Sequence, residues 1–85
     1  VVDHMNFLMM AAHDTITSSA TALVYLLAKH PEWQGRVRDE LLGIVEAPGA
    51  DLAYEDLGKP ELTEMAFKEA LRMIPPVPSL PRRAL

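Results

Sequence analysis

The chain has 85 residues, a formal net charge of −4 at pH 7 and a pI near 5.2. This acidic balance argues against nucleic acid as a partner, because nucleic-acid binding needs a clustered basic surface that displaces counterions. The sequence has no cysteine, which excludes disulfides and cysteine-ligated metal sites within these residues. The first residue already lies in an apolar run, and the length suits one small domain or a piece of a larger one, so we expect an internal fragment.

Residues 1–29 are predicted to form one long helix, because apolar residues recur near the helical period of 3.6. They are Met5, Leu8, Met9, Ala12, Ile16, Ala20, Leu23 and Leu27. Val24, Tyr25 and Leu26 fill the other sides, and a helix that is apolar nearly all round is usually buried inside something larger. The charge-free run 15–28 is shorter than the roughly 20 residues of a membrane-spanning helix, so we predict a buried helix and no membrane span.

A second helix is predicted at about 31–45. Pro31 ends the first helix, because the residue before a proline avoids the helical region, and it suits the first turn of the next helix. The apolar face of this second helix is formed by Trp33, Val37, Leu41 and Ile44 or Val45. Residues 46–59 are expected to form a loop with a short helical turn.

A third helix is predicted at about 60–74, opened by Pro60. Its apolar residues are Leu62, Met65, Ala66 and Leu71. The prolines of "PPVPSLP" fix the backbone dihedrals and remove donors, so residues 75–85 are expected to be extended. No strand pattern is strong enough to assign before residue 75, and the predicted fold class is mainly α.

The stretch "AAHDT" places polar residues in the middle of the apolar first helix. Ala11 and Thr15 are neighbours on nearly one face at i and i+4, and the alanines Ala11 and Ala12 leave room for a flat group near the backbone. Thr15 adds a hydroxyl beside that gap, and Asp14 adds an ionisable group. A site that relays protons beside a bound planar group needs this set of residues. Thr15 can also bond back to a preceding carbonyl, which loosens a helix.

The same stretch also allows an interpretation without chemistry. Thr15, Ser18 and Thr21 would form a packing seam of small residues, and Asp14 would pair elsewhere. The chain would then be a non-catalytic helical packing or interaction module, and its isolated form would unfold cooperatively.

Glu69 and Arg72 stand three residues apart on the predicted third helix. Such pairs are common on exposed helix faces and say little by themselves. This pair lies one turn before Pro75 and Pro76, where the helix must stop, and arginine can contact a carboxylate and loop carbonyls together. A buried pair at this point would fix the angle between the helix and the segment after it.

Several other classes of site have no support in the sequence. His4, His13 and His30 do not have the spacing of metal ligands, and no Gly-rich phosphate loop occurs. The serines lack the G-x-S-x-G context of a hydrolase nucleophile. We therefore predict no metal ligand within this segment.

Three stretches in register resemble one family. "AAHDT" resembles the A-[AG]-x-[DE]-T signature of the cytochrome P-450 haem-thiolate monooxygenases, and "LLAKHPEWQGRVRDEL" resembles their next segment, in which H-P opens a helix. "KEALRMIPPVPSLPRRA" resembles their E-x-x-R helix, the P-P break and the strand that follows. The resemblance covers nearly the whole chain. It implies a mainly α fragment of the cytochrome P-450 fold, with a long distal helix, two further helices and the start of a β-strand.

The resemblance implies that the first helix crosses the distal face of haem b, an iron protoporphyrin IX. Ala11 and Ala12 would lie over the porphyrin where dioxygen binds. Thr15 would hydrogen-bond the oxygen and steady proton delivery, and Asp14 would feed that relay. Asp14 and Thr15 are thus the expected catalytic residues.

Further roles are implied at the proximal side and the haem edge. Glu69 and Arg72 would be the buried ion pair that holds the core together. Arg82, or Arg83 if the register slips by one, would pair with a haem propionate. The family's cysteine ligand lies downstream of the E-x-x-R helix, so we expect the thiolate beyond Leu85 and no iron ligand in this segment.

The candidates to line a substrate pocket are Phe7, Leu8, His13, Val77 and Leu80. Their mostly apolar character suggests a small hydrophobic organic substrate. The implied reaction is reductive activation of dioxygen, followed by insertion of one oxygen atom into a substrate C–H bond. The implied partners are that substrate, dioxygen and an electron donor, either a ferredoxin or a flavoprotein reductase. The parent protein would be cytoplasmic if it lacks an N-terminal anchor.

Overall fold

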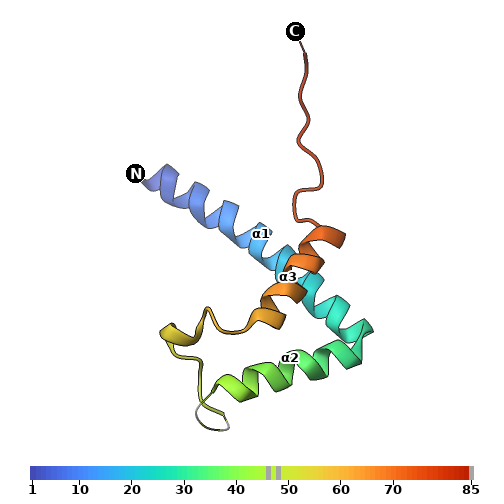
Figure 1. The fold of residues 1–85 in the computed structure, drawn as a ribbon. Helices are drawn as coiled ribbons and strands as arrows, with labels where there is room; N and C mark the ends of the chain where they lie inside the picture. Colours follow the sequence, from blue (N-terminus) through green and yellow to red (C-terminus); the bar gives the residue numbers. More distant parts are fainter. Residues whose placement is uncertain (46, 48, 85) are drawn as a thin grey trace.

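The computed structural model describes residues 1–45, 47 and 49–84, and this part of the chain is mainly α-helical. Its helices are α1 (Val2–Lys29), α2 (Pro31–Ile44) and α3 (Glu61–Met73), with the 3₁₀ turn η1 (Tyr54–Asp56) between α2 and α3 (Figure 1). The predicted mainly α fold class is therefore confirmed. Residues 46 and 48 of the predicted loop, and residue 85 of the predicted extended segment, lie outside the described residues.

The boundary between α1 and α2 follows from Pro31. His30 has φ −126° and ψ 75°, outside the helical region, because a proline restricts the residue before it. Pro31 is then the first residue of α2, where its missing N–H removes no intrahelical bond. The chain therefore turns sharply at one residue between two helices (Figure 1).

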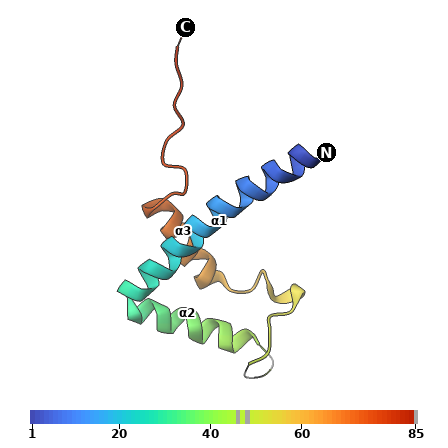
Figure 2. The same cartoon turned by 180° about the vertical axis from the view of Figure 1, so that it is seen from behind.

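Residues 75–84 leave the end of α3 as an irregular segment that bends at Pro76 and Val77 and then runs extended. The resemblance implied the start of a β-strand here, but no described segment pairs with it. A strand needs a neighbour for its N–H and C=O groups, and the prolines offer no N–H. Both views show the segment pointing away from the helices (Figures 1 and 2).

The three helices meet in one junction. α3 packs across α1, and α2 packs against both, whereas the first half of α1 projects from the junction (Figures 1 and 2). The radius of gyration is 16.8 Å. A compact domain of this length would have a radius of about 12 Å, so the assembly is open.

The core of the junction is small and is made mostly of small side chains. The buried residues of the described part are Ser19 and Ala22 on α1, Val37 on α2 and Ala70 on α3, and Ala70 is 0% exposed. Small side chains allow two helix axes to approach closely, because interaxial distance depends on the residues at the contact. No large side chain of the described part is fully buried.

The packed face of α1 agrees with the predicted apolar stripe only in part: Leu23 and Leu27 are half-buried in the junction, but other positions differ. Ile16, a member of the stripe, is 66% exposed, whereas Thr15 is half-buried and Ser19 is buried. Because α1 is apolar nearly all round, its period cannot select a face, and the close crossing selects small residues instead. The alternative seam is displaced in the same way: Ser18 and Thr21 are exposed, and Ser19 lies at the contact.

The predicted faces of the other helices hold in part. On α2, Val37 is buried and Leu41 and Ile44 are half-buried, as the spacing predicted. On α3, Met65 is 59% exposed, whereas Ala70, which lay outside the predicted face, is the most buried residue. The crossing with α1 again selects the smallest side chain.

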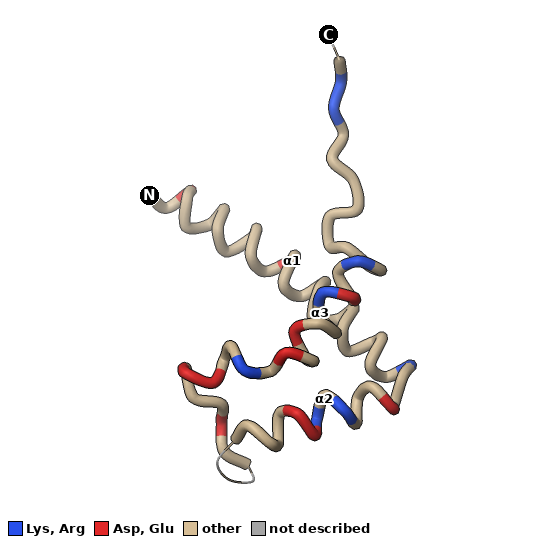
Figure 3. Tube along the Cα trace, in the orientation of Figure 1, with Lys and Arg blue, Asp and Glu red and all other residues tan. Residues whose placement is uncertain are grey.

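Charged side chains are distributed unevenly over the helices (Figure 3). Asp14 is the charged residue of α1 between Asp3 and Lys29, whereas both signs occur along α2 and α3. Among the helices of the described residues, none is long and apolar enough to cross a membrane.

Candidate functional site

Thr15 lies where the exposed first part of α1, residues 2–14, meets the part that packs in the junction. Its hydroxyl is hydrogen-bonded to the backbone of the same helix. The Thr15 Oγ1 donates a hydrogen bond to the carbonyl oxygen of Ala11 at 2.9 Å and lies 3.4 Å from that of Ala12. The backbone stays α-helical through this turn, so the expected loosening does not interrupt α1. With its proton engaged, the hydroxyl offers lone pairs to a ligand, and it must rotate to donate a proton.

Asp14 adjoins Thr15 in sequence but lies on another side of α1. Successive residues of an α-helix are about 100° apart around the axis, so the Asp14 carboxylate and the Thr15 hydroxyl leave the helix in different directions. Asp14 is exposed. Proton transfer between the two side chains therefore requires a bridging water or a rotation of the carboxylate.

Ala11, Ala12 and His13 form an accessible surface on the projecting part of α1. All three are exposed, and Ala12 and His13 border a wide, open depression together with Met9 and Ile16. The two alanines put only methyl groups beside the Thr15 hydroxyl. A flat group could therefore approach the helix backbone at this point.

The other predicted site residues are exposed and do not border that depression. They are Phe7, Leu8, Val77, Leu80, Arg82 and Arg83. The first two are on the projecting part of α1, and the other four are on the segment that leaves α3 (Figure 1). The described residues bring no substrate pocket together from them, and their roles stay predictions.

Glu69 and Arg72 form a forked ion pair on α3. Arg72 Nε donates to Glu69 Oε2 and Arg72 Nη2 donates to Glu69 Oε1, both at 2.7 Å. The Arg72 hydrogen bond, opposed by desolvation and aided by the Arg72 charge, lowers the pKa of Glu69, and the same contact raises the pKa of Arg72. The resemblance implied a buried pair. Here the Glu69 and Arg72 side chains are 54% and 70% exposed, because no other described segment covers this part of α3.

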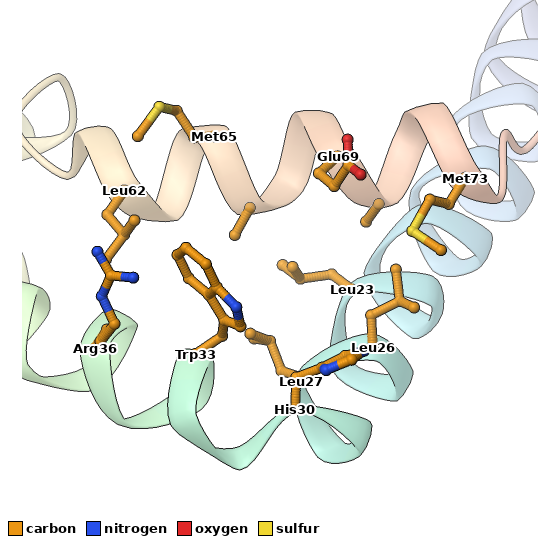
Figure 4. Close-up of a pocket in the computed structure, with 12 residues that line it drawn as sticks. Leu23, Leu26, Leu27, His30, Trp33, Arg36, Leu62, Met65, Glu69 and Met73 are labelled. Carbon is orange, nitrogen blue, oxygen red and sulfur yellow. The ribbon is translucent and has the colours of Figure 1, made fainter.

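A second hollow, of about 490 Å³, lies among the three helices (Figure 4). Trp33 of α2 points into it towards α3, and Leu23 and Leu27 of α1 face the same space. The Arg36 guanidinium lies 4.2 Å from the centre of the Trp33 ring. Apart from Arg36, Glu69 and His30, the lining is apolar, and neither Asp14 nor Thr15 reaches it. This hollow is thus the incompletely filled centre of the helix junction.

Glu40 joins α2 to α3 through three hydrogen bonds, and the sequence analysis did not single it out. From α2, its carboxylate accepts hydrogen bonds from the backbone N–H groups of Leu62 (2.7 Å) and Thr63 (2.8 Å) and from the Thr63 hydroxyl (2.8 Å). Desolvation raises the pKa of Glu40, but the hydrogen bonds from Leu62 and Thr63 together lower it below its ordinary value. The charged carboxylate is therefore the form that this contact stabilises.

A signal for Glu40 was present in the sequence. Val37, Glu40, Leu41 and Ile44 follow the spacing i, i+3, i+4 and i+7, so Glu40 stands on the apolar face of α2. A carboxylate on an apolar face needs donors, and the first turn of another helix offers free N–H groups. The sequence could not show which helix would supply them.

The comparison with protein families identifies the class. The family model described as cytochrome P-450 matches residues 2–85. The chain belongs to the cytochrome P-450 family, which the three motifs in register had suggested. Members of this family are haem-dependent oxidoreductases of the monooxygenase class.

Individual relatives agree with this assignment. A Mycobacterium tuberculosis protein named putative cytochrome P-450 136 is 48% identical over 77 residues, which are 91% of this chain and 15% of the relative. Cytochrome P-450 4A7 of Oryctolagus cuniculus is 44% identical over 72 residues, and cytochrome P-450 4X1 of Homo sapiens is 40% identical over 74 residues. These alignments cover 85% and 87% of this chain and 14% of each relative. No solved structure matches the chain at a significant level.

Proposed function

We propose that this chain is the dioxygen-facing and core-helix segment of a haem-dependent monooxygenase. The enzyme inserts one oxygen atom into a small hydrophobic organic substrate. The observation that carries the proposal is the register of "AAHDT", "HPEW" and "EALRMIPP" within a family match that covers residues 2–85. The chain spans only about 15% of the length of its relatives, so it would supply part of the site.

The residues of the projecting part of α1 fit one face of a haem. Ala11 and Ala12 are exposed and short, and the Thr15 hydroxyl is held beside them by its bond to the Ala11 carbonyl. The sequence has no cysteine, and the described residues hold no cluster of three His, Asp or Glu side chains that could bind a metal. Because the sequence has no cysteine, a thiolate iron ligand would come from another part of the protein, expected after residue 85. When bound, haem b would supply the reductive activation of dioxygen.

Within that site Thr15 would place a hydroxyl next to the reacting oxygen. Its bond to Ala11 holds the oxygen atom of the side chain in one position, and rotation about the Cβ–Oγ1 bond would free the proton. Asp14 would then restore protons from solvent, since its carboxylate is exposed and lies around the helix from the hydroxyl. Thr15 would thus deliver the proton, and Asp14 would replace it from solvent.

Other residues would complete the surroundings of the haem. Arg82, with Arg83 as the alternative, would pair with a propionate, and the Glu69–Arg72 pair would hold the proximal core. Phe7, Leu8, His13, Val77 and Leu80 would line the substrate pocket. A ferredoxin or a flavoprotein reductase would supply electrons. The location of the parent protein depends on whether it has an N-terminal anchor.

The proposal is tested in the full-length protein with Thr15→Ala. Reduced, carbon-monoxide-bound wild-type protein should show the absorption band of a thiolate-ligated haem. In the variant we expect reduction to continue while product formed per electron falls by about tenfold or more, with peroxide released instead, because general acid catalysis commonly contributes at least about a hundredfold. The measurement compares electron-donor consumption, peroxide and product.

Two further variants separate the hydroxyl from a packing effect. Thr15→Ser keeps a hydroxyl and should retain most of the coupling between electrons and product. Thr21→Ala makes the same change on an exposed position of α1 and should leave coupling unchanged. Unchanged coupling in Thr15→Ala would disprove the role of Thr15, and a wild-type protein without the thiolate band would disprove the haem function.

A further inference from the structure

We propose that Glu40 is a positioning residue that fixes the angle of α3 relative to α2 and α1. Its carboxylate bridges two elements through three hydrogen bonds of 2.7–2.8 Å. Through α3 it would set the Glu69–Arg72 pair and the direction in which the chain leaves towards Arg82. The part that concerns haem rests on the proposed function.

The contact takes the place of a missing helix cap. The N-cap residue of α3 is Pro60, which makes no side-chain capping bond. The Glu61 N–H donates to the Lys59 carbonyl, but the N–H groups of Leu62 and Thr63 have no acceptor within the first turn of α3. The Glu40 carboxylate accepts hydrogen bonds from the N–H groups of Leu62 and Thr63, which lie 22 and 23 residues later in the chain. The negative carboxylate also lies at the positive end of the α3 dipole. A local cap would satisfy the same groups but would not join α3 to α2.

A second contact helps to fix the angle of α3, because α3 crosses α1 at small side chains. The crossing buries small side chains, with Ala70 as the most buried residue of α3. Small side chains at the centre of a crossing interlock less than large ones do, so they constrain the crossing angle less. Leu62 lies eight residues from Ala70, which is about 12 Å along the helix axis. A bond at that distance from the crossing constrains the angle effectively.

The crossing angle matters most on the far side of Ala70. The segment after α3 leads to Arg82, nine residues beyond Met73, and both views show it leaving from the end of α3 (Figures 1 and 2). A tilt of α3 about Ala70 redirects the start of that segment, and displacements of about 1 Å already disturb catalytic geometry. Glu40 would therefore act on haem retention without touching haem.

The test uses the haem-loaded full-length protein and four variants. Glu40→Ala removes the contact, and Asp39→Ala removes the neighbouring exposed carboxylate as a matched control. Glu40→Ala with Pro60→Asp replaces the bridging contact by a local cap, since an N-cap aspartate accepts bonds from the same first-turn N–H groups. Glu40→Gln keeps one side-chain oxygen as an acceptor, and it takes the place of Glu40→Ala in both measurements if that variant does not fold. Two quantities are measured: the urea midpoint of unfolding and the rate of haem transfer to an excess of apomyoglobin.

We expect Glu40→Ala to lower the midpoint and to speed haem transfer by about tenfold or more, the scale for lost charge-assisted hydrogen bonds. Adding Pro60→Asp should restore the midpoint but not the haem transfer rate, because the cap does not fix the angle. Glu40→Gln should be intermediate, and Asp39→Ala should match the wild type.

Three outcomes would overturn the inference. In the first, Glu40→Ala or Glu40→Gln releases haem at the wild-type rate. In the second, Pro60→Asp added to Glu40→Ala restores both the urea midpoint and the haem transfer rate, which would make Glu40 only a cap. In the third, Asp39→Ala changes the midpoint and the transfer rate as strongly as Glu40→Ala does. A wild-type protein that binds no haem would instead disprove the proposed function, and the midpoints would still show whether Glu40 joins the helices.

Discussion

The two parts of α1 have different surroundings although the helix is continuous. Residues 2–14 are exposed throughout, including Phe7 and Met9, and they carry Ala11, Ala12 and Asp14. Residues 15–29 reach the junction, where Ser19 and Ala22 are buried. The first part, with Thr15 at its boundary, carries the proposed site residues of α1, and the rest of the second part holds the helix in place.

This difference shows which parts of the site depend on other segments of the protein. An exposed apolar surface as long as residues 2–14 marks a place that further protein or a ligand covers. The junction, in contrast, forms from the three helices of this chain alone. We therefore expect mutations in the junction to act through stability, and mutations in the projecting part to act through activity.

The largest expected effect is the loss of cooperative unfolding when the 85 residues are isolated. Few residues are buried in the described part and no large side chain among them is fully buried, so the core is too small to hold one state. Circular dichroism and Trp33 fluorescence should change gradually with temperature and without a common midpoint. A sharp transition seen by both probes would contradict this, and would favour the non-catalytic helical module.

A smaller effect is expected from pH, acting on the junction through Glu40. Its folded pKa is lowered from the ordinary value of 4.5, so the unfolded chain takes up the proton first as the pH falls. The stability that Glu40 contributes is therefore complete above pH 4.5 and is lost as the pH falls through the lowered pKa. Urea unfolding of the full-length protein should show a difference between wild type and Glu40→Ala that closes over this range.

The pH experiment needs the difference between two proteins because other carboxyls also titrate there. Asp56 has a lowered pKa through a hydrogen bond from Lys59, and Glu69 has one through Arg72. Both are unchanged in Glu40→Ala, so subtraction isolates Glu40. A difference that stays constant from pH 6 down to acid unfolding would contradict the assigned contact.

The smallest effect is expected from Ser19→Ala, on the junction side of Thr15. Ser19 Oγ donates to the Thr15 carbonyl at 2.8 Å, the same kind of local bond that Thr15 makes to Ala11. Its loss should cost less than about 1 kcal/mol of unfolding free energy, because alanine is the better helix former and the bond is local. Coupling of electrons to product should not change. A coupling loss equal to that of Thr15→Ala would remove the distinction between the two parts of α1.

The sequence predicted the helices well because their limits depend on local chemistry. Pro31 sets the corner between α1 and α2, and the prolines from Pro75 onward prevent α3 from continuing. The register of the motifs also indicated the family, because residue types at fixed spacing can be recognised without knowledge of packing. The packed face of α1 was predicted only in part: Leu23 and Leu27 are half-buried, but Ser19 and not Ile16 lies at the crossing. A helix that is apolar on nearly every side shows no distinct apolar face in its sequence.

What only the tertiary structure decided is how the helices are placed relative to one another. The bond from Glu40 to Thr63 joins residues 23 positions apart, and no local pattern names the partner of a carboxylate. The exposure of the Glu69–Arg72 pair likewise depends on which segments cover α3. The sequence by itself determined the helices, their ends and the motif positions, because backbone sterics and side-chain spacing act over a few residues. Packing depends on the shapes and free hydrogen-bonding groups of residues far apart in the chain, so the placement of the helices could be learned only from the tertiary structure.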